Sequence, residues 1–517
     1  MTGMKSTRRV CLALLLVLAL GRFGLAVGRQ LSWPEDLVYE TPQLTVVEVV
    51  RRGESFYDAR CWQEPPYVLN PYGPVYPLMV AALPDRAEHP FLSGRLVSLA
   101  AVLALVGLIL QLGGRTGRGP ALAAVALLLL SRAETTNAAF MKADTLAVLF
   151  SSLAVVLALR FGPRSRSGAA LSALVGVLAI ATKQSLAGGL AAAGLWYLLH
   201  DRRSALVFSL VAAGLPLGLL ALGTAVHGHG VRLTLTGVQR QALTLEQWRQ
   251  IMTEILCDPG LIGLIVLAAV VFARRLREDR SVLLRTPIPA FVALSTIIML
   301  VTVAKVGSSV NYVLEPLAAV ALLVASCAGD PGTDDRSGPA AESGAPDDSA
   351  GKDGSGVSES GPDGRSCGQL PVGVLAGLAL LAALEVGLAP ADTFCLAAPE
   401  RRARRQSAID QIRAEIRELG GERPKILNLG SKWATYAERR AASPGDPWLF
   451  RVLWLHGTLD PAHVIRRLDA REFDLVLIPE RFANLPRVDH PFCRAVGRNY
   501  RLAKARPGLH YYRPKAR

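Results

Sequence analysis

The sequence predicts an α-helical polytopic membrane protein with a small C-terminal extracytoplasmic α/β domain. Across 517 residues the chain is 51% hydrophobic, with a mean hydropathy of +0.32 and only 19% charged residues. The apolar residues form blocks that suit bilayer crossings, and short Arg-rich connections separate the blocks. After residue 390 these blocks stop, and the pattern becomes that of a soluble α/β fold.

The net charge of +15 has a membrane explanation. In a soluble protein this excess would suggest nucleic-acid binding. Here the arginines cluster in the short connections between apolar blocks, as in cytoplasmic loops that face anionic lipid. We therefore expect a membrane partner and no nucleic-acid partner.

We expect about eleven transmembrane helices, at ~20 residues per crossing. The first, Val10–Val27, lacks a convincing signal-peptide cleavage site and is interpreted as an uncleaved helix with its N-terminus inside. The short block Ala121–Leu130 must be tilted, partly re-entrant or extended into its polar flanks. The other predicted spans are Leu92–Leu112, Thr145–Phe161, Gly168–Ala181, Leu186–Leu199, Ser204–Val226, Leu261–Ala273, Ile288–Ala304, Tyr312–Ala328 and Pro371–Leu388.

This topology divides the chain into four parts. Residues 1–328 form the main transmembrane domain, with an acidic first outer loop at 30–90. Residues 329–368 are rich in Gly, Ser, Asp and Pro and should be a disordered cytoplasmic linker, either a regulatory tether or, as we favour, an expandable loop. Residues 369–389 are the last span. Residues 390–517 form the outer domain, with a first helix, two short strands separated by a second helix, and a closing hairpin.

The cysteines and histidines give weak signals. No cysteine pair has metal-site spacing. Cys395 and Cys493 would both lie outside, where they could form a disulfide or remain free thiols. His227 and His229 form one HxH motif without carboxylate neighbours, which favours an ordinary loop over a metal site.

The outer ends of the predicted spans carry an unusual set of polar residues. An ionisable group near the bilayer core costs about 2.5–3.5 kcal/mol on insertion scales, so each needs an explanation. Cations beside carboxylates would suit a lipid-linked phosphate substrate, because the cations hold the phosphate and a carboxylate activates the acceptor. The candidate substrate-binding residues are Tyr72, Tyr76, Arg132, Lys142, Asp144, Lys183, Lys305, Asn311 and Tyr312.

Each candidate also has a structural alternative. Lys142 or Lys183 could extend to the membrane interface from a helix end. Asp144 could cap the helix that begins with TLAVLF. Tyr72 and Tyr76 could belong to an interfacial aromatic belt.

Several stretches together resemble the GT-C superfamily of polytopic glycosyltransferases, especially bacterial relatives of the protein O-mannosyltransferase and aminoarabinose-transferase family. The resemblance lies in their order and spacing and covers most of the chain outside the linker. The stretches are DLVYE to VVRRGESFYD, PYGPVYPLMVAAL, GRLVSLAAVLALV, KADTLAVLFSSLAVVLAL, ATKQS, KVGSSVNYVLEPLAA and the YYRP ending.

The resemblance implies a cell-envelope glycosylation reaction. Such enzymes transfer a sugar, with inversion, from a polyprenyl-phosphate donor to a lipid, glycan or protein hydroxyl at the outer face of the inner or plasma membrane. A carboxylate of the first outer loop acts as general base, which points to Glu40 first and Asp36 second. The family's commoner Asp-Glu pair is absent, since Tyr39 precedes Glu40.

The remaining roles follow from the same resemblance. Lys183, Lys305, Arg132 or Lys142 would face the phosphate, and Asn311 and Tyr312 would shape the cavity. No DxD metal motif is evident. An inverting displacement needs one base and a stabilised leaving group, so no cofactor is required and a divalent metal is optional.

Two other classes of function are compatible with these features. A transporter or flippase of a lipid-linked substrate would use a similar cationic cavity without a base and would often show repeated helices, but no clear repeat occurs. A noncatalytic membrane scaffold would leave the charged outer rim unexplained.

Overall fold

The structure is a computed structural model of the chain. It describes residues 2–33, 40–58, 60–64, 67–86, 88–114, 118–237, 242–278, 281–305, 308–328, 370–388, 399–422, 424–429, 453–454, 459–480 and 490–516. The predicted linker 329–368, the candidate base Asp36 and the cysteine Cys395 lie outside the described residues.

Every segment predicted as a span forms a helix, so the expected α-helical polytopic fold is confirmed. Among the described residues, six helical segments are long and apolar enough to cross a membrane by length and composition, and others are shorter apolar helices. The bundle helices are α1 (Thr2–Ser32), α5 (Leu92–Gly113), α6 (Arg118–Leu130), α8 (Asp144–Phe161), α9 (Arg166–Thr182), α10 (Gly188–His200), α11 (Arg202–His227), α14 (Pro259–Glu278), α16 (Ile288–Thr302), α17 (Leu314–Ala328) and α18 (Val372–Leu388).

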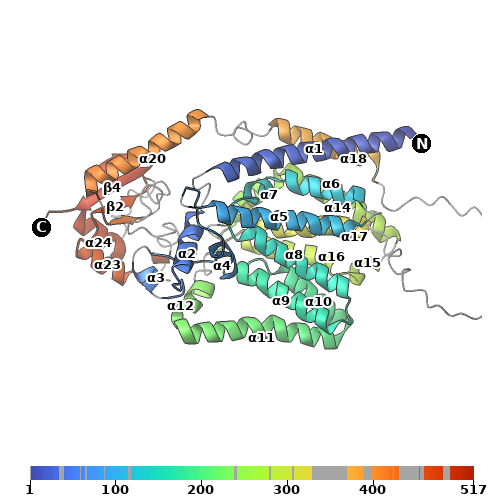
Figure 1. Ribbon diagram of the computed structural model, residues 1–517, viewed down its shortest axis with the longest axis horizontal. Helices are drawn as coiled ribbons and strands as arrows, with labels where there is room; N and C mark the ends of the chain where they lie inside the picture. Colours follow the sequence, from blue (N-terminus) through green and yellow to red (C-terminus); the bar gives the residue numbers. More distant parts are fainter. Residues whose placement is uncertain are drawn as a thin grey trace, which may run out of the picture.

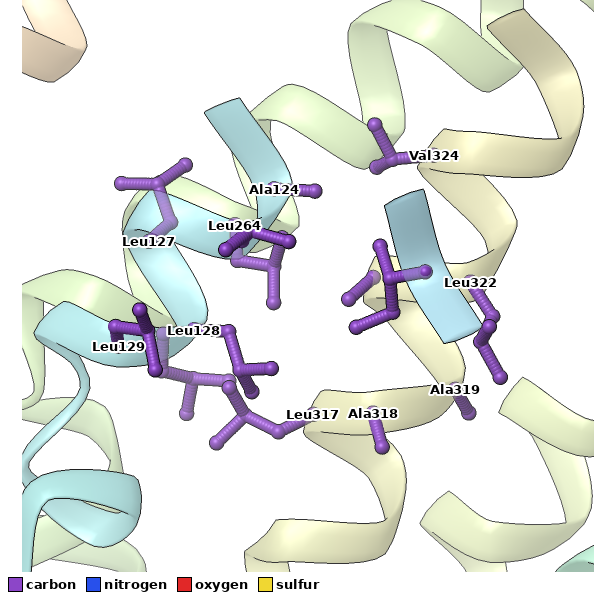
Figure 2. Packing of buried hydrophobic residues seen from close by; sticks show 14 of the residues in the cluster. Ala124, Leu127, Leu128, Leu129, Leu264, Leu317, Ala318, Ala319, Leu322 and Val324 are labelled. Atoms are coloured by element: carbon purple, nitrogen blue, oxygen red, sulfur yellow. The ribbon is translucent and has the colours of Figure 1, made fainter. Parts of the chain in front are cut away.

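Helices α6 and α17 form the centre of this bundle. Apolar side chains of the two helices pack against each other and against α14 (Figure 2). Small residues such as Ala318 and Ala319 allow the helices to approach closely. By contrast, α11 leaves most of its apolar surface exposed, as expected of a helix that faces lipid (Figure 1).

The segment predicted as the first outer loop contains three short helices among its described residues. It contains α2 (Thr41–Arg51), α3 (Arg60–Gln63) and α4 (Val75–Ala81), which lie between the bundle and the C-terminal unit (Figure 1). Helix α2 has Pro42 in its first turn, where a missing N–H is tolerated, and buries its apolar face. The other connecting elements are α7 (Arg132–Asn137), α12 (His229–Arg232), the π-helix η1 (Leu233–Gly237), α13 (Leu245–Leu256), α15 (Val282–Arg285) and the 3₁₀ helix η2 (Val310–Val313).

The C-terminal unit has the expected α/β composition. Its sheet has the order β1-β2-β4-β3, with β1 parallel to β2 and the other pairs antiparallel. Alternate strand residues point to opposite faces, so α20 covers one face while α23 and α24 cover the other. The elements are α20 (Pro399–Gly420), β1 (Ile426–Asn428), α23 (Ala462–Asp469), β2 (Leu475–Ile478), α24 (Pro491–Asn499), β3 (Tyr500–Arg506) and β4 (Leu509–Pro514).

The C-terminal unit is joined to the first outer loop by a shared apolar core. Trp62 and Tyr67 of the loop are buried in the same cluster as Trp454. The rings of Tyr67 and Trp454 meet edge to face, with centroids 6.1 Å apart. Tyr67 adopts a positive φ of 52°, a conformation that non-glycine residues rarely take. The packing of the Tyr67 ring against Trp454 holds the loop against the C-terminal unit.

Candidate functional site

Three segments bring Asp144, Lys183 and Asn311 together at one end of the bundle. Asp144 begins α8, Lys183 follows the last residue of α9, and Asn311 lies in η2. Lys183 Nζ contacts Asp144 Oδ1, and Asn311 Nδ2 donates to the same oxygen over 2.7 Å. All three side chains are at most 6% exposed. The second carboxylate oxygen, Asp144 Oδ2, is buried and has no hydrogen-bond partner among the described residues.

Two tyrosines flank the lysine of this group. Lys183 Nζ lies 5.4 Å from the ring centroid of Tyr72 and 4.6 Å from that of Tyr312. Both distances are within the range of a cation–π interaction. We refer to Asp144, Lys183, Asn311, Tyr72 and Tyr312 as the charged cluster.

Tyr72 reaches the cluster because the neighbouring backbone approaches α9 closely. A Cβ at Gly73 would lie 1.7 Å from the carbonyl oxygen of Ala181, so only glycine fits there. Asn70 shapes this turn: its Oδ1 accepts from the amide of Tyr72 over 3.1 Å, and its Nδ2 donates to the carbonyl of Gly73 over 3.2 Å.

Lys305 adds a second cation near the cluster. It lies in the turn after α16 and is partly buried. Burial and the positive charge of Lys183 lower the pKa of Lys305 to about 8. Lys183 and Lys305 lie within electrostatic range of each other, and two cations at one end of the bundle favour an anion there.

The first-choice base, Glu40, lies in a separate buried pair with Arg95 of α5. Glu40 Oε1 accepts from Arg95 Nε over 2.9 Å and from the amide of Met141 over 2.7 Å, while Oε2 accepts from Arg95 Nη2 over 2.5 Å. Both side chains are almost fully buried. Both carboxylate oxygens of Glu40 are therefore engaged, one by Arg95 and one by Arg95 together with the amide of Met141. Glu40 therefore has the geometry of a residue that fixes the loop.

The same arginine holds both ends of the segment that contains Asp36. Arg95 Nη1 donates to the carbonyl of Trp33, immediately before residues 34–39, and its fork holds Glu40, immediately after them. Nη1 also donates to the carbonyl of Gln30 over 2.7 Å. The described residues thus fix where this acidic segment begins and ends.

The remaining candidates are placed differently. Tyr76 is fully buried in an apolar core, where its hydroxyl donates to the carbonyl of Gly94 over 2.9 Å. Arg132 is exposed at the start of α7. Lys142 Nζ lies over the ring of Phe140, 5.2 Å from its centroid. Tyr76 lies in the same apolar core against which Tyr72 of the charged cluster packs.

The capping alternative for Asp144 is wrong. Ala143 occupies the N-cap position of α8, which has no side-chain cap, and Asp144 is the first helical residue. Its carboxylate instead turns toward Lys183 and Asn311, because a buried negative charge is stabilised more by a cation than by one amide.

Arg95 and Ser151 are the residues that the sequence did not single out. Arg95 stands alone in the apolar run GRLVSLAAVLALV, and a lone arginine near a span was a usable signal. Ser151 donates to Glu315 deeper in the bundle. A serine within an apolar helix gives no such signal.

The histidine motif and the cysteines form no metal site among the described residues. No group of three or more His, Cys, Asp or Glu side chains there could hold a metal ion. His227 Nε2 lies 3.4 Å from Ser55 Oγ in the first outer loop. Cys493 is a buried free thiol.

The fold resembles that of one protein in the comparisons with solved structures. Crystal structures of ArnT from Cupriavidus metallidurans, in the apo state and bound to undecaprenyl phosphate, each align with a TM-score of 0.54 over 97% of both chains, at 12% sequence identity. A comparison with protein-family models finds no match, and a comparison with curated proteins finds none either. The chain thus has an ArnT-like polytopic fold, in agreement with the GT-C resemblance of its sequence.

Proposed function

We propose that this protein is a GT-C-type membrane glycosyltransferase that uses a polyprenyl-phosphate-linked sugar donor. The acceptor would be a hydroxyl of a lipid, glycan or protein at the outer face of the membrane. The charged cluster with Lys305 is the observation that carries this proposal. The chain has an ArnT-like fold, and one of the aligned ArnT crystal structures contains bound undecaprenyl phosphate. This likeness supports the choice of donor.

The cations would act mainly on the leaving group. The donor phosphodiester carries one negative charge, and the departing polyprenyl phosphate gains a second as the bond from the sugar C1 to oxygen breaks. Lys183 and Lys305 would stabilise this developing charge more than that of the bound donor, which lowers the barrier. Tyr72 and Tyr312 keep Lys183 in place, and the unpartnered Asp144 Oδ2 is available to a substrate hydroxyl.

A first-loop carboxylate would remove the acceptor proton as the new bond to C1 forms with inversion. Glu40 is engaged by Arg95 and by the amide of Met141, so we assign this role to Asp36 and a positioning role to Glu40. The C-terminal unit, packed on the same loop, would lie outside and face the acceptor.

Binding and turnover by the purified full-length chain test this proposal. Wild type should bind undecaprenyl phosphate and release it from at least one member of a panel of undecaprenyl-phosphate-linked sugars. Lys183→Met should weaken binding and abolish release. Arg274→Ala is the control, since Arg274 lies in an exposed pair with Glu278 on α14. Failure of wild type to bind, or equal binding by Lys183→Met, would refute the proposal.

A further inference from the structure

A second polar layer lies deeper in the bundle than the charged cluster. It consists of Ser151 on α8, Gly189 at the start of α10 and Glu315 at the start of α17, and we call it the inner layer. Ser151 Oγ contacts Glu315 Oε1, and the amide of Gly189 donates to Ser151 Oγ over 2.9 Å and to Glu315 Oε1 over 3.3 Å. Glu315 is 1% exposed and Ser151 is fully buried.

The inner layer is closely packed. A Cβ at Gly189 would lie 2.2 Å from the carbonyl oxygen of Ser151, and one at Gly188 would lie 2.8 Å from Cβ of Ser295. Only glycines therefore allow the start of α10 to approach α8 and α16 so closely. Among the described residues no ion pair involves Glu315, so its oxygen is held by hydrogen bonds and by the positive end of α10.

The same three chain segments supply both layers. Asp144 and Ser151 lie seven residues apart on α8, about two helical turns. Asn311 and Glu315 lie four residues apart, about one turn. Lys183 begins the short connection that follows α9, and Gly189 is the second residue of α10, to which this connection leads. Lys183 and Asn311, which both contact Asp144, are therefore each followed a few residues later by a residue of the inner layer.

We propose that Glu315 is a positioning residue for the donor-phosphate site. Its accepting oxygen fixes α8, the α9–α10 connection and η2 relative to one another. This arrangement of the three segments keeps Asn311 Nδ2 and Lys183 Nζ in contact with Asp144 Oδ1. The contact from Asn311 is 2.7 Å, and a shift of about 1 Å would take it beyond hydrogen-bond range.

The conservative variant separates this role from proton transfer. Glu315→Gln keeps an oxygen that can accept from Ser151 and Gly189, whereas Glu315→Ala removes it. If Glu315 instead transferred protons during the reaction, both substitutions would abolish that role equally. Equal damage by both would overturn the positioning role.

The experiment uses purified full-length protein in detergent and two readouts. The first is amide hydrogen exchange of peptides covering 183–190 and 308–316. The second is the Kd for undecaprenyl phosphate, and only this second readout rests on the proposed function. Ser172→Ala is the matched control, because Ser172 is also buried and donates to the carbonyl of Ala154 over 2.6 Å between α9 and α8.

We expect Glu315→Ala to increase exchange in both peptides and to weaken binding roughly tenfold, as for the loss of about one charge-assisted hydrogen bond. Glu315→Gln should stay within about threefold of wild type, and Ser172→Ala should match wild type in both readouts. If Glu315→Ala does not fold, Ser151→Ala should raise exchange in the same peptides. Unchanged exchange in the folded variant overturns the proposal. Failure of wild type to bind undecaprenyl phosphate would instead refute the proposed donor site, and exchange would still decide the role of Glu315.

Discussion

The titration of Lys305 gives the sharpest test of the donor-phosphate site. With a pKa of about 8, Lys305 is about nine-tenths protonated at pH 7 and about one-tenth at pH 9. A bound phosphate would favour its charged form and raise that pKa. Binding above pH 8 must therefore take up a proton, and the affinity must fall as the pH rises.

The expected size of the effect follows from that linkage. The Kd for undecaprenyl phosphate should change little between pH 7 and pH 7.5 and should be about tenfold higher at pH 9 than at pH 7, or about 1.4 kcal/mol. The ligand does not contribute, because the second phosphate pKa is about 6. Burial raises the pKa of Glu134 to about 7. The Glu134 carboxyl therefore titrates mainly below the pH range of 7.5 to 9 in which the Kd is expected to rise.

The assay is a fluorescence titration of the purified protein with undecaprenyl phosphate at constant ionic strength between pH 7 and pH 9.5. Lys305→Arg retains a positive charge throughout and should give a flat profile. Lys305→Met should bind weakly at every pH, also with a flat profile. A flat profile for wild type, or an unchanged slope in Lys305→Arg, would show that Lys305 does not face the phosphate.

Three further predictions concern the first outer loop. Asp36→Asn should abolish sugar transfer while the protein still binds undecaprenyl phosphate; retained turnover would exclude Asp36 as the base. Glu40→Gln and Arg95→Met should each lower the thermal midpoint, since breaking a buried pair costs about 3–5 kcal/mol. In a double-mutant cycle measured by thermal unfolding, the double variant should lose less stability than the two single variants lose together. Gly73→Ala should destabilise the protein because its Cβ would overlap the end of α9, whereas Gly107→Ala, with open space around its Cβ, should be close to neutral; equal melting of the two would contradict this packing argument.

The helices could be predicted from the sequence because hydrophobicity alone determines them. A block of apolar residues has no alternative to helix in a bilayer, so even the short block Ala121–Leu130 was found. The strands of the C-terminal unit were also evident from runs such as FDLVLIP. The helices of the first outer loop were missed, because α2 follows a Pro-containing segment and its burial depends on tertiary contacts with α4 and the bundle.

The site could be predicted only in part, since sequence spacing does not specify contacts across helices. Lys183, Asp144 and Asn311 were singled out as ionisable or polar residues at outer span ends, and the structure places them in contact. The pairing of Glu40 with Arg95 joins residues 55 positions apart, and no local pattern encodes it. Tyr76 looked like Tyr72 in the sequence, but the pitch of α4 turns it into the core.

The hydrogen bonds of the buried acids bear on where the base must come from. A general base needs a lone pair that is free to accept the proton of the acceptor hydroxyl. Both oxygens of Glu40 are bonded by Arg95, and Glu315 accepts its bonds deeper in the bundle, whereas Asp144 keeps one oxygen, Oδ2, without a hydrogen-bond partner among the described residues. Arg95 meanwhile fixes the backbone on both sides of residues 34–39. The buried Glu40–Arg95 pair thus anchors the described residues on both sides of the acidic segment that supplies the proposed base, Asp36.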